Sequence, residues 1–239
     1  MIFNNIGEAD TSIIHLLCKQ QFVERFSGGL SYILCVVLDL EKIESLVEAV
    51  LTRLFVPVEA SGRHVHVTKE QAMTLFGHEL TAGRALSQPG QYLSGERVTL
   101  IGPKGELDRV AVLGPERKEA QVEISLTDGK TLGITPPIRL SGKVEGTPGI
   151  TLRGPAGEVK LSQGVMAAQR HIHLHPKQAE HFGVTDKQVV RLQTLTDRPV
   201  IFEDVVVRVN PEYEAAVHLD YDEANACALR PGDLGRILP

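Results

Sequence analysis

The sequence RHVHV at residues 63–67 is nearly repeated as RHIHL at residues 170–174, 107 positions later. Both phrases alternate histidine with an apolar residue, which is the pattern of a β-strand. Side chains in a strand point alternately to its two faces, so the two histidines of each phrase share one face. Their side chains start about 6.5–7 Å apart along the strand. Each pair can therefore aim at one point or at two neighbouring points.

A single histidine on a strand is usually structural, whereas two matched pairs in one chain favour a metal site. Neutral imidazole is the commonest protein ligand for metals. The predicted metal-ligating histidines are His64, His66, His171 and His173.

Each phrase is followed by a predicted short helix. Thr68-Lys69-Glu70-Gln71 fits the capping-box pattern, and Pro176 suits the first turn of a helix. The pairs Gln71-Ala72 and Gln178-Ala179 keep the same offset as the histidines. The strand–helix unit is therefore predicted to be duplicated within the chain.

A longer amphipathic helix is predicted at residues 41–55, where apolar residues recur at spacings of three and four. We expect this stripe to be buried, and Pro57 to end the helix. Short strands separated by Gly/Pro turns dominate the remainder, with a hairpin expected at Asp128-Gly129. The predicted strands cover residues 97–101, 110–113, 121–125, 131–134, 150–153, 189–194, 200–209 and 215–219, with a last one after residues 230–233. This pattern indicates a mainly β protein of two small β-barrels with short capping α-helices.

Composition restricts the possible classes of protein. A net charge of −5 and a pI of about 6.0 give no basic footprint for nucleic acid. Cys18, Cys35 and Cys227 are far apart, as in a reduced intracellular chain. The first ten residues lack a secretory signal, and the apolar run at residues 30–40 is too short to span a membrane. We therefore expect a soluble, cytoplasmic protein with no membrane partner.

Three further residues are candidates for the site. His218 lies in a strand-like apolar run, where it either binds metal or forms a core hydrogen bond. Glu123 lies mid-strand, either on a solvated outer face or as a metal carboxylate. Arg117 is displayed on a turn, where it is either solvated or binds phosphate or carboxylate. The other histidines are predicted to be structural, with His175 at a helix entry and His15, His78 and His181 in helices or loops.

Three phrases together resemble one family. They are SGRHVHV at residues 61–67, GPER at 114–117 with QVEIS at 121–125, and AQRHIH at 168–173. In these phrases the chain is similar to the phosphate propanoyltransferases of bacterial microcompartments, over about residues 41–239. The resemblance implies reversible exchange of an acyl-CoA, such as propionyl-CoA, and orthophosphate for acyl phosphate and CoA. It also implies a role in propanediol degradation, with microcompartment shell or cargo proteins as partners.

The resemblance further implies two barrels around a dinuclear zinc site. Residues 56–62 with 169–239 would form the first barrel, and residues 63–168 the second. One Zn²⁺ would be held by His64, His66 and Glu123, and the other by His171, His173 and His218. Arg117 would bind phosphate, and Ser141 would lie on the CoA side.

Residues 1–40 depart from the family, whose members usually begin near the helix at 41–55. This N-terminal extension is either a targeting peptide, an extra packing element, or the product of a start codon that is not used. Mass spectrometry of the native N-terminus would decide between them.

Two other classes of function are open from the sequence. A zinc-dependent thioester hydrolase would release CoA without phosphate. A non-catalytic scaffold protein would keep zinc for structure, but structural zinc normally has four protein ligands and often cysteine. Exposed barrel faces also favour a homodimer.

Overall fold

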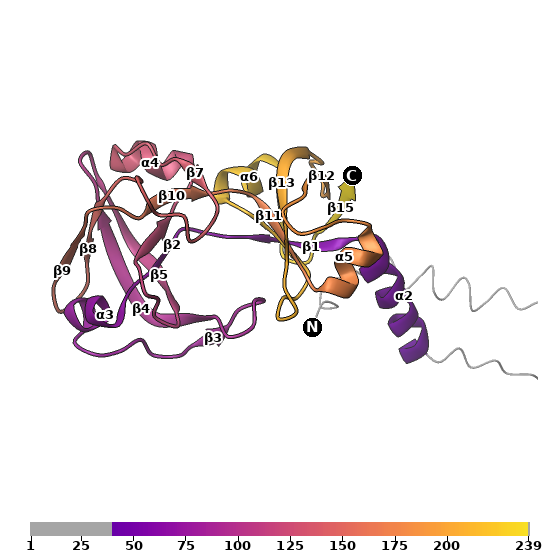
Figure 1. The fold of residues 1–239 in the computed structure, drawn as a ribbon, viewed down its shortest axis with the longest axis horizontal. Helices are drawn as coiled ribbons and strands as arrows, with labels where there is room; N and C mark the ends of the chain where they lie inside the picture. Colours follow the sequence, from indigo (N-terminus) through magenta and orange to yellow (C-terminus); the bar gives the residue numbers. More distant parts are fainter. Residues whose placement is uncertain (1–39, 239) are drawn as a thin grey trace, which may run out of the picture. The chain divides into compact units, whose positions relative to one another are not determined.

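The computed structural model describes residues 40–238. The predictions for residues 1–39 lie outside this range. The described chain is mainly β, with one closed barrel and one curled, open sheet (Figure 1). The predicted fold class is therefore confirmed, with one sheet closed and the other left open. Among the described residues, the helices are all too short or too polar to cross a membrane.

The closed barrel has six strands in the order β1-β14-β11-β13-β12-β15. β1 is parallel to β14 and antiparallel to β15, so a strand from before the first histidine phrase closes a barrel otherwise built from the C-terminal part. The strands are β1 (Val56–Ala60), β11 (His171–Leu174), β12 (Val189–Leu195), β13 (Ile201–Val209), β14 (Ala216–Leu219) and β15 (Leu234–Leu238).

The second sheet has nine strands in the order β7-β10-β6-β2-β5-β4-β8-β9, with β3 paired to β4 outside this path. Its strands are β2 (His64–His66), β3 (Arg84–Ala85), β4 (Tyr92–Ile101), β5 (Glu106–Gly114), β6 (Gln121–Glu123), β7 (Ile138–Arg139), β8 (Ile150–Arg153), β9 (Glu158–Leu161) and β10 (Val165–Ala168). The chain passes directly from β1 in the barrel to β2 in this sheet (Figure 1).

Four short helices each follow a strand and begin with a capping box: α3 (Lys69–Phe76), α4 (Leu126–Leu132), α5 (Pro176–Phe182) and α6 (Tyr221–Ala226). The longer helix α2 (Leu40–Leu54) precedes β1. Thr68 caps α3 as predicted, and His175 caps α5 with Pro176 in its first turn. Capping satisfies backbone N–H groups that the first turn of a helix leaves free. Local sequence therefore fixes where the chain leaves each strand.

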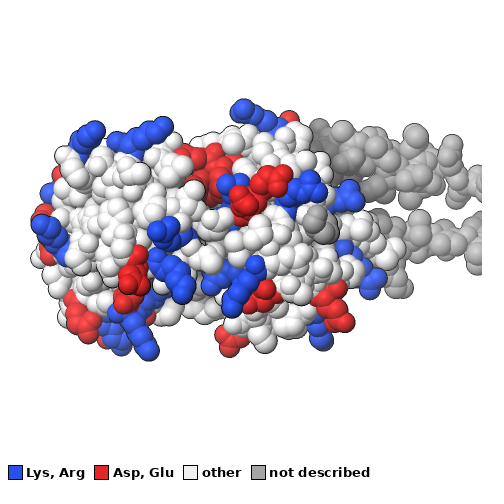
Figure 2. Space-filling view, turned by 45° about the horizontal axis from the view of Figure 1, so that its top comes forward, with Lys and Arg blue, Asp and Glu red and all other residues white. Residues whose placement is uncertain are grey.

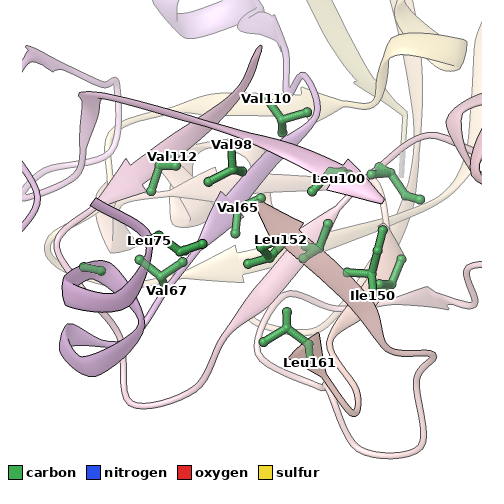
Figure 3. Close-up of a cluster of buried hydrophobic side chains, with 14 of the residues drawn as sticks. Val65, Val67, Leu75, Val98, Leu100, Val110, Val112, Ile150, Leu152 and Leu161 are labelled. Carbon is green, nitrogen blue, oxygen red and sulfur yellow. The ribbon is translucent and has the colours of Figure 1, made fainter. Parts of the chain in front are cut away.

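Each sheet has its own apolar core. In the nine-stranded sheet, valine and leucine side chains from β2, β4, β5 and β8 pack against Leu75 of α3 (Figure 3). In the barrel, residues such as Ile172, Leu192 and Leu219 are fully buried. The apolar residues between the histidines, Val65 and Ile172, point into these cores. The histidines therefore face away from them.

Two sequence predictions are wrong. Residues 126–132 form helix α4 rather than a hairpin at Asp128-Gly129 and a strand at 131–134. The Ser125 hydroxyl accepts from the backbone N–H of Asp128, whose carboxylate accepts from the N–H of Ser125, and Gly133 ends the helix in the left-handed conformation. This capping box outweighs the turn propensity of Asp-Gly.

The predicted helix at 41–55 is present as α2, but the residues of its apolar stripe from Leu46 to Leu54 whose side chains are described are exposed. Val50, Leu51 and Leu54 are 46, 37 and 56 % exposed. Periodicity shows that a helix has an apolar face without showing what covers it.

On the face drawn in Figure 2, basic and acidic side chains are interspersed with wide uncharged areas, in keeping with the modest net charge.

The turn between β8 and β9 gives a test of the packing. A Cβ added at Gly154 would lie 2.3 Å from the backbone oxygen of Leu75, at the end of α3. That oxygen also accepts a 2.9 Å hydrogen bond from Ala156. We expect Gly154→Ala to lower the free energy of unfolding by about 1–3 kcal/mol, measured by urea denaturation.

Gly95 provides the matched control. A Cβ there meets nothing closer than 4.0 Å, so Gly95→Ala should change stability by less than about 0.5 kcal/mol. Equal effects of the two substitutions would contradict the close approach of this turn to α3.

Candidate active site

The four paired histidines lie on β2 and β11. In each strand they are two residues apart and point to the same face. The ring centroids of His64 and His66 are 5.0 Å apart, and those of His171 and His173 are 4.7 Å apart. All four side chains are buried. Each phrase therefore presents two adjacent, buried imidazoles.

A third side chain joins each pair from the adjacent antiparallel strand. His64 is directly opposite Glu123 of β6, and His171 is directly opposite His218 of β14. Directly opposed residues share a face of the sheet. The two resulting groups are the His–Glu group (His64, His66, Glu123) and the three-histidine group (His171, His173, His218). Within each group the potential ligand atoms all lie within 4.8 Å of one another.

The first histidine of each phrase is held in the same way. Nδ1 of His64 lies 2.8 Å from the backbone oxygen of Gly62, and Nδ1 of His171 lies 2.8 Å from that of Gln169. A carbonyl oxygen can only accept, so each Nδ1 carries the proton and donates it. This leaves Nε2 of both rings with a free lone pair. Such backbone contacts are typical of histidines that bind metal through the other nitrogen.

Several ring nitrogens in the two groups are buried without a hydrogen-bond partner. They are Nδ1 of His66, both nitrogens of His173 and Nε2 of His218. An unpaired buried polar atom costs roughly 1–3 kcal/mol, so a cluster of such nitrogens fits a site that binds a ligand such as a metal ion.

Burial keeps these imidazoles neutral at neutral pH. It is the largest cause that lowers the pKa of His66 and of His173 to about 2. It likewise lowers the pKa of His171 and of His218 to about 4. Neutral nitrogens with free lone pairs are the form that binds metal ions. The residues present therefore fit one metal ion in each group.

Glu123 is buried but stays ionised. Burial alone would raise the pKa of this carboxyl, but electrostatic interaction with His64 and His171 and a hydrogen bond from Ser141 hold it below its ordinary value. Gln121 donates from its amide nitrogen to Glu123 and, at 2.9 Å, to the Ser141 hydroxyl. The Gln121 oxygen accepts from the Gly142 backbone at 2.7 Å. One buried amide thus joins the carboxylate to the Ser141 loop.

The arginines that open the two phrases have matching structural roles. Arg63 forms an ion pair with Asp128 at 2.8 Å, and Arg170 forms one with Glu223 at 2.8 Å. Asp128 is the third residue of α4, the helix that follows Glu123, and Glu223 is the third residue of α6, the helix that follows His218. Each of these carboxylates also completes the capping box of its helix. The internal duplication therefore extends to the strand that supplies the third ligand and to its helix.

Both groups line one cavity of about 810 Å³. The cavity brings together all eight site residues expected from the sequence: His64, His66, Arg117, Glu123, Ser141, His171, His173 and His218. Burial, opposed by the charge of Glu123, lowers the pKa of the Arg117 guanidinium. The backbone N–H of Arg117 donates to Val67 at 2.9 Å, which fixes its loop beside β2.

The remaining described histidines lie outside this cavity. The ring of His175 caps α5, as its predicted position at a helix entry suggests. His78 contacts Glu79, and His181 contacts the backbone oxygen of Arg53. His15 lies outside the described residues. No sequence pattern singles out Gln121, Arg208 or Tyr213, which belong to the site through strand register or packing rather than a motif.

The fold and the cavity define a two-sheet β protein with adjacent His–Glu and three-histidine groups suited to metal ions. A sequence model described as phosphate propanoyltransferase matches residues 57–230. The phosphate propanoyltransferase of Clostridioides difficile is 50 % identical over 202 residues, covering 82 % of this chain and 97 % of that protein.

Two other relatives with the same name are similarly close. The protein from Listeria monocytogenes is 50 % identical over 204 residues, covering 83 % of this chain and 96 % of its own length. The protein from Thermotoga maritima is 52 % identical over 180 residues, covering 74 % and 86 %. The chain belongs to the phosphate propanoyltransferase family, a family of acyltransferases.

Proposed function

We propose that this protein is a phosphate acyltransferase that converts an acyl-CoA and orthophosphate into acyl phosphate and free CoA, and catalyses the reverse reaction. Family membership supports the reaction type. The observation that carries the assignment to this cavity is the convergence of two potential metal-binding groups, Arg117 and Ser141 on one cavity. Propionyl-CoA or a similar short-chain thioester is the proposed substrate.

We propose two Zn²⁺ ions per chain as the cofactors. The His–Glu group would hold one and the three-histidine group the other. Three nitrogen or oxygen ligands with an open position are the pattern of catalytic zinc. When bound, zinc would supply Lewis-acid polarisation and charge stabilisation for the oxygen and sulfur atoms of the reaction.

The polypeptide would supply binding, orientation and charge. A phosphate oxygen attacks the thioester carbonyl carbon, a tetrahedral oxyanion forms, and the C–S bond breaks to release the CoA thiolate. Arg117 is partly buried, so its charge acts on phosphate with less screening than at the surface. The buried imidazoles of His66 and His173 stay neutral at neutral pH, so they carry no positive charge that would bind phosphate in place of Arg117.

Ser141 is proposed to lie on the CoA side of the cavity. The Ser141 hydroxyl accepts a hydrogen bond from the side-chain amide of Gln121. The oxygen of the same amide accepts from the backbone N–H of Gly142, which fixes the loop that carries Ser141. The thioester would then be positioned relative to Glu123 through one hydrogen-bond network. Such fixed networks contribute to catalysis by holding reactants in orientation.

We expect Arg117→Ala to lower kcat/KM by at least about tenfold, equivalent to about 1.4 kcal/mol of barrier. The reason is the loss of charge complementarity to phosphate. Initial rates at varied phosphate concentration measure it, with exposed Lys118→Ala as the neighbouring control. Unchanged phosphate kinetics in Arg117→Ala would contradict this role.

The experiment that tests the function is release of free CoA from propionyl-CoA, with and without phosphate, before and after chelation. We expect release only with both phosphate and metal. Release without phosphate would instead identify the zinc-dependent thioester hydrolase. No turnover by a folded, metal-loaded sample would favour the non-catalytic scaffold.

The family resemblance also supports a location inside a bacterial microcompartment, with shell or cargo proteins as partners. We further propose a homodimer, since exposed barrel faces favour one. Analytical ultracentrifugation of the full chain tests the dimer, and co-purification with shell proteins from the native host tests the location.

A further inference from the structure

Arg208 is one of five arginines that line the cavity, the others being Arg63, Arg84, Arg117 and Arg230. It lies on β13 directly beside His173 of β11, and neighbouring residues in register project from the same face of a sheet. Its guanidinium carbon lies 5.9 Å from the ring centre of Tyr213, and that ring is 4.3 Å from the His173 ring. Arg208 and Tyr213 both line the cavity with the three-histidine group.

Two of these arginines, Arg117 and Arg208, are partly buried and form no ion pair within the described residues. Within residues 40–238, no carboxylate forms an ion pair or hydrogen bond with the guanidinium of Arg117 or of Arg208. Of the other cavity arginines, Arg63 and Arg230 are paired with Asp128 and Asp197, and Arg84 is exposed. A partly buried cation without a partner is costly, and a bound anion removes that cost.

The guanidinium groups of Arg117 and Arg208 act on one another. After burial and the opposing effect of Glu123, the charge of Arg208 contributes to lowering the pKa of Arg117. Both guanidinium groups line the cavity that also contains the His–Glu group and the three-histidine group, so their positive potential would attract a dianion to this cavity.

We propose that Arg208 and Arg117 together bind the phosphoryl group of orthophosphate and of acyl phosphate. This inference rests on the proposed acyltransferase function and adds a second substrate-contacting residue. A phosphate has enough oxygens to accept hydrogen bonds from two guanidinium groups at once. The Tyr213 ring holds the Arg208 side chain by a cation–π contact and so limits the rotamers it must lose on binding.

The test compares Arg208→Gln and Arg208→Lys with the unaltered, metal-loaded enzyme. For Arg208→Gln we expect the KM for phosphate to rise on the order of 10- to 100-fold, with the KM for propionyl-CoA within about twofold. Arg208→Lys keeps the charge but loses the planar fork, so a smaller rise is expected. Calorimetric titration of each protein with orthophosphate alone should show the same order of weakening.

Arg191→Gln is the matched control. Arg191 lies on β12, next to β13, but is exposed and outside the cavity. The substitution Arg191→Gln removes the same charge from the same barrel as Arg208→Gln. It should leave the KM for phosphate and the KM for propionyl-CoA unchanged. Metal content measured by mass spectrometry should also be the same in all variants.

The outcomes separate this inference from the proposed function. An unaltered enzyme with no phosphate-dependent CoA release would refute the proposed function. An active enzyme whose Arg208→Gln variant keeps its KM and calorimetric affinity for phosphate would refute only the role of Arg208. A rise confined to the KM for propionyl-CoA would also refute it, since Arg208 would then serve the thioester. If Arg208→Gln does not fold, Arg208→Lys decides by the same phosphate measurements.

Discussion

His171→Ala is expected to reduce phosphate-dependent CoA release by about 10³-fold or more. His171 has a buried ring whose Nδ1 is fixed by the Gln169 backbone, and it belongs to a group proposed to hold one metal ion. Loss of that ion removes several kcal/mol of transition-state stabilisation, and about 4 kcal/mol corresponds to 10³-fold. Initial rates and metal content by mass spectrometry measure the two effects. We expect roughly half of the metal to remain, because the His–Glu group is intact.

His181→Ala is the control for this variant. His181 is an exposed histidine of helix α5 outside the cavity, and its ring contacts the backbone oxygen of Arg53 and the ring of Phe182. It should keep full activity and metal content. A His171→Ala protein with normal metal content and normal rates would refute the three-histidine group as a catalytic metal site.

Glu123→Gln is expected to lower the rate by about 10²- to 10³-fold. The substitution keeps the shape of the side chain but replaces an anionic ligand by a neutral amide next to His64 and beside the amide of Gln121. Weaker metal affinity and lost charge both contribute. The metal content should again fall by roughly half, and the double variant His171→Ala/Glu123→Gln should bind almost none.

Glu119→Gln is the matched control, because this carboxylate is exposed on the loop just before β6. It should behave as the unaltered protein. If Glu123→Gln binds metal normally and loses activity, the carboxylate acts on the reactants directly rather than as a ligand.

The strands and their caps could be predicted from the sequence because the signals are local. Alternation marks β2 and β11, and the Thr68 capping box and Pro176 mark the helices that follow. The same alternation predicts that the two histidines of each phrase share one face of their strand. Local patterns did not predict α4, since the Ser125 capping box competes with the Asp-Gly turn signal and only the folded chain shows which one prevails.

The third member of each group could not be chosen from the residues alone. Whether Glu123 and His218 face the cavity depends on which strands pair and in what register, and register is a tertiary property. Family resemblance, rather than periodicity, placed these two residues beside the histidine pairs. The same limit applies to α2, whose apolar stripe was predicted to be buried and is exposed in the described structure.

The closure of the barrel by β1 has a consequence for how the protein is made. Residues 58–60 must pair with residues 217–219, and residues 56–57 with 234–235, after the whole nine-stranded sheet has been synthesised between them. Contacts between such distant segments are slow to form because a long loop must close first. During translation β1 therefore leaves the ribosome long before its partners exist. The nine-stranded sheet can assemble early, whereas the barrel is completed only after residues 234–238 have left the ribosome.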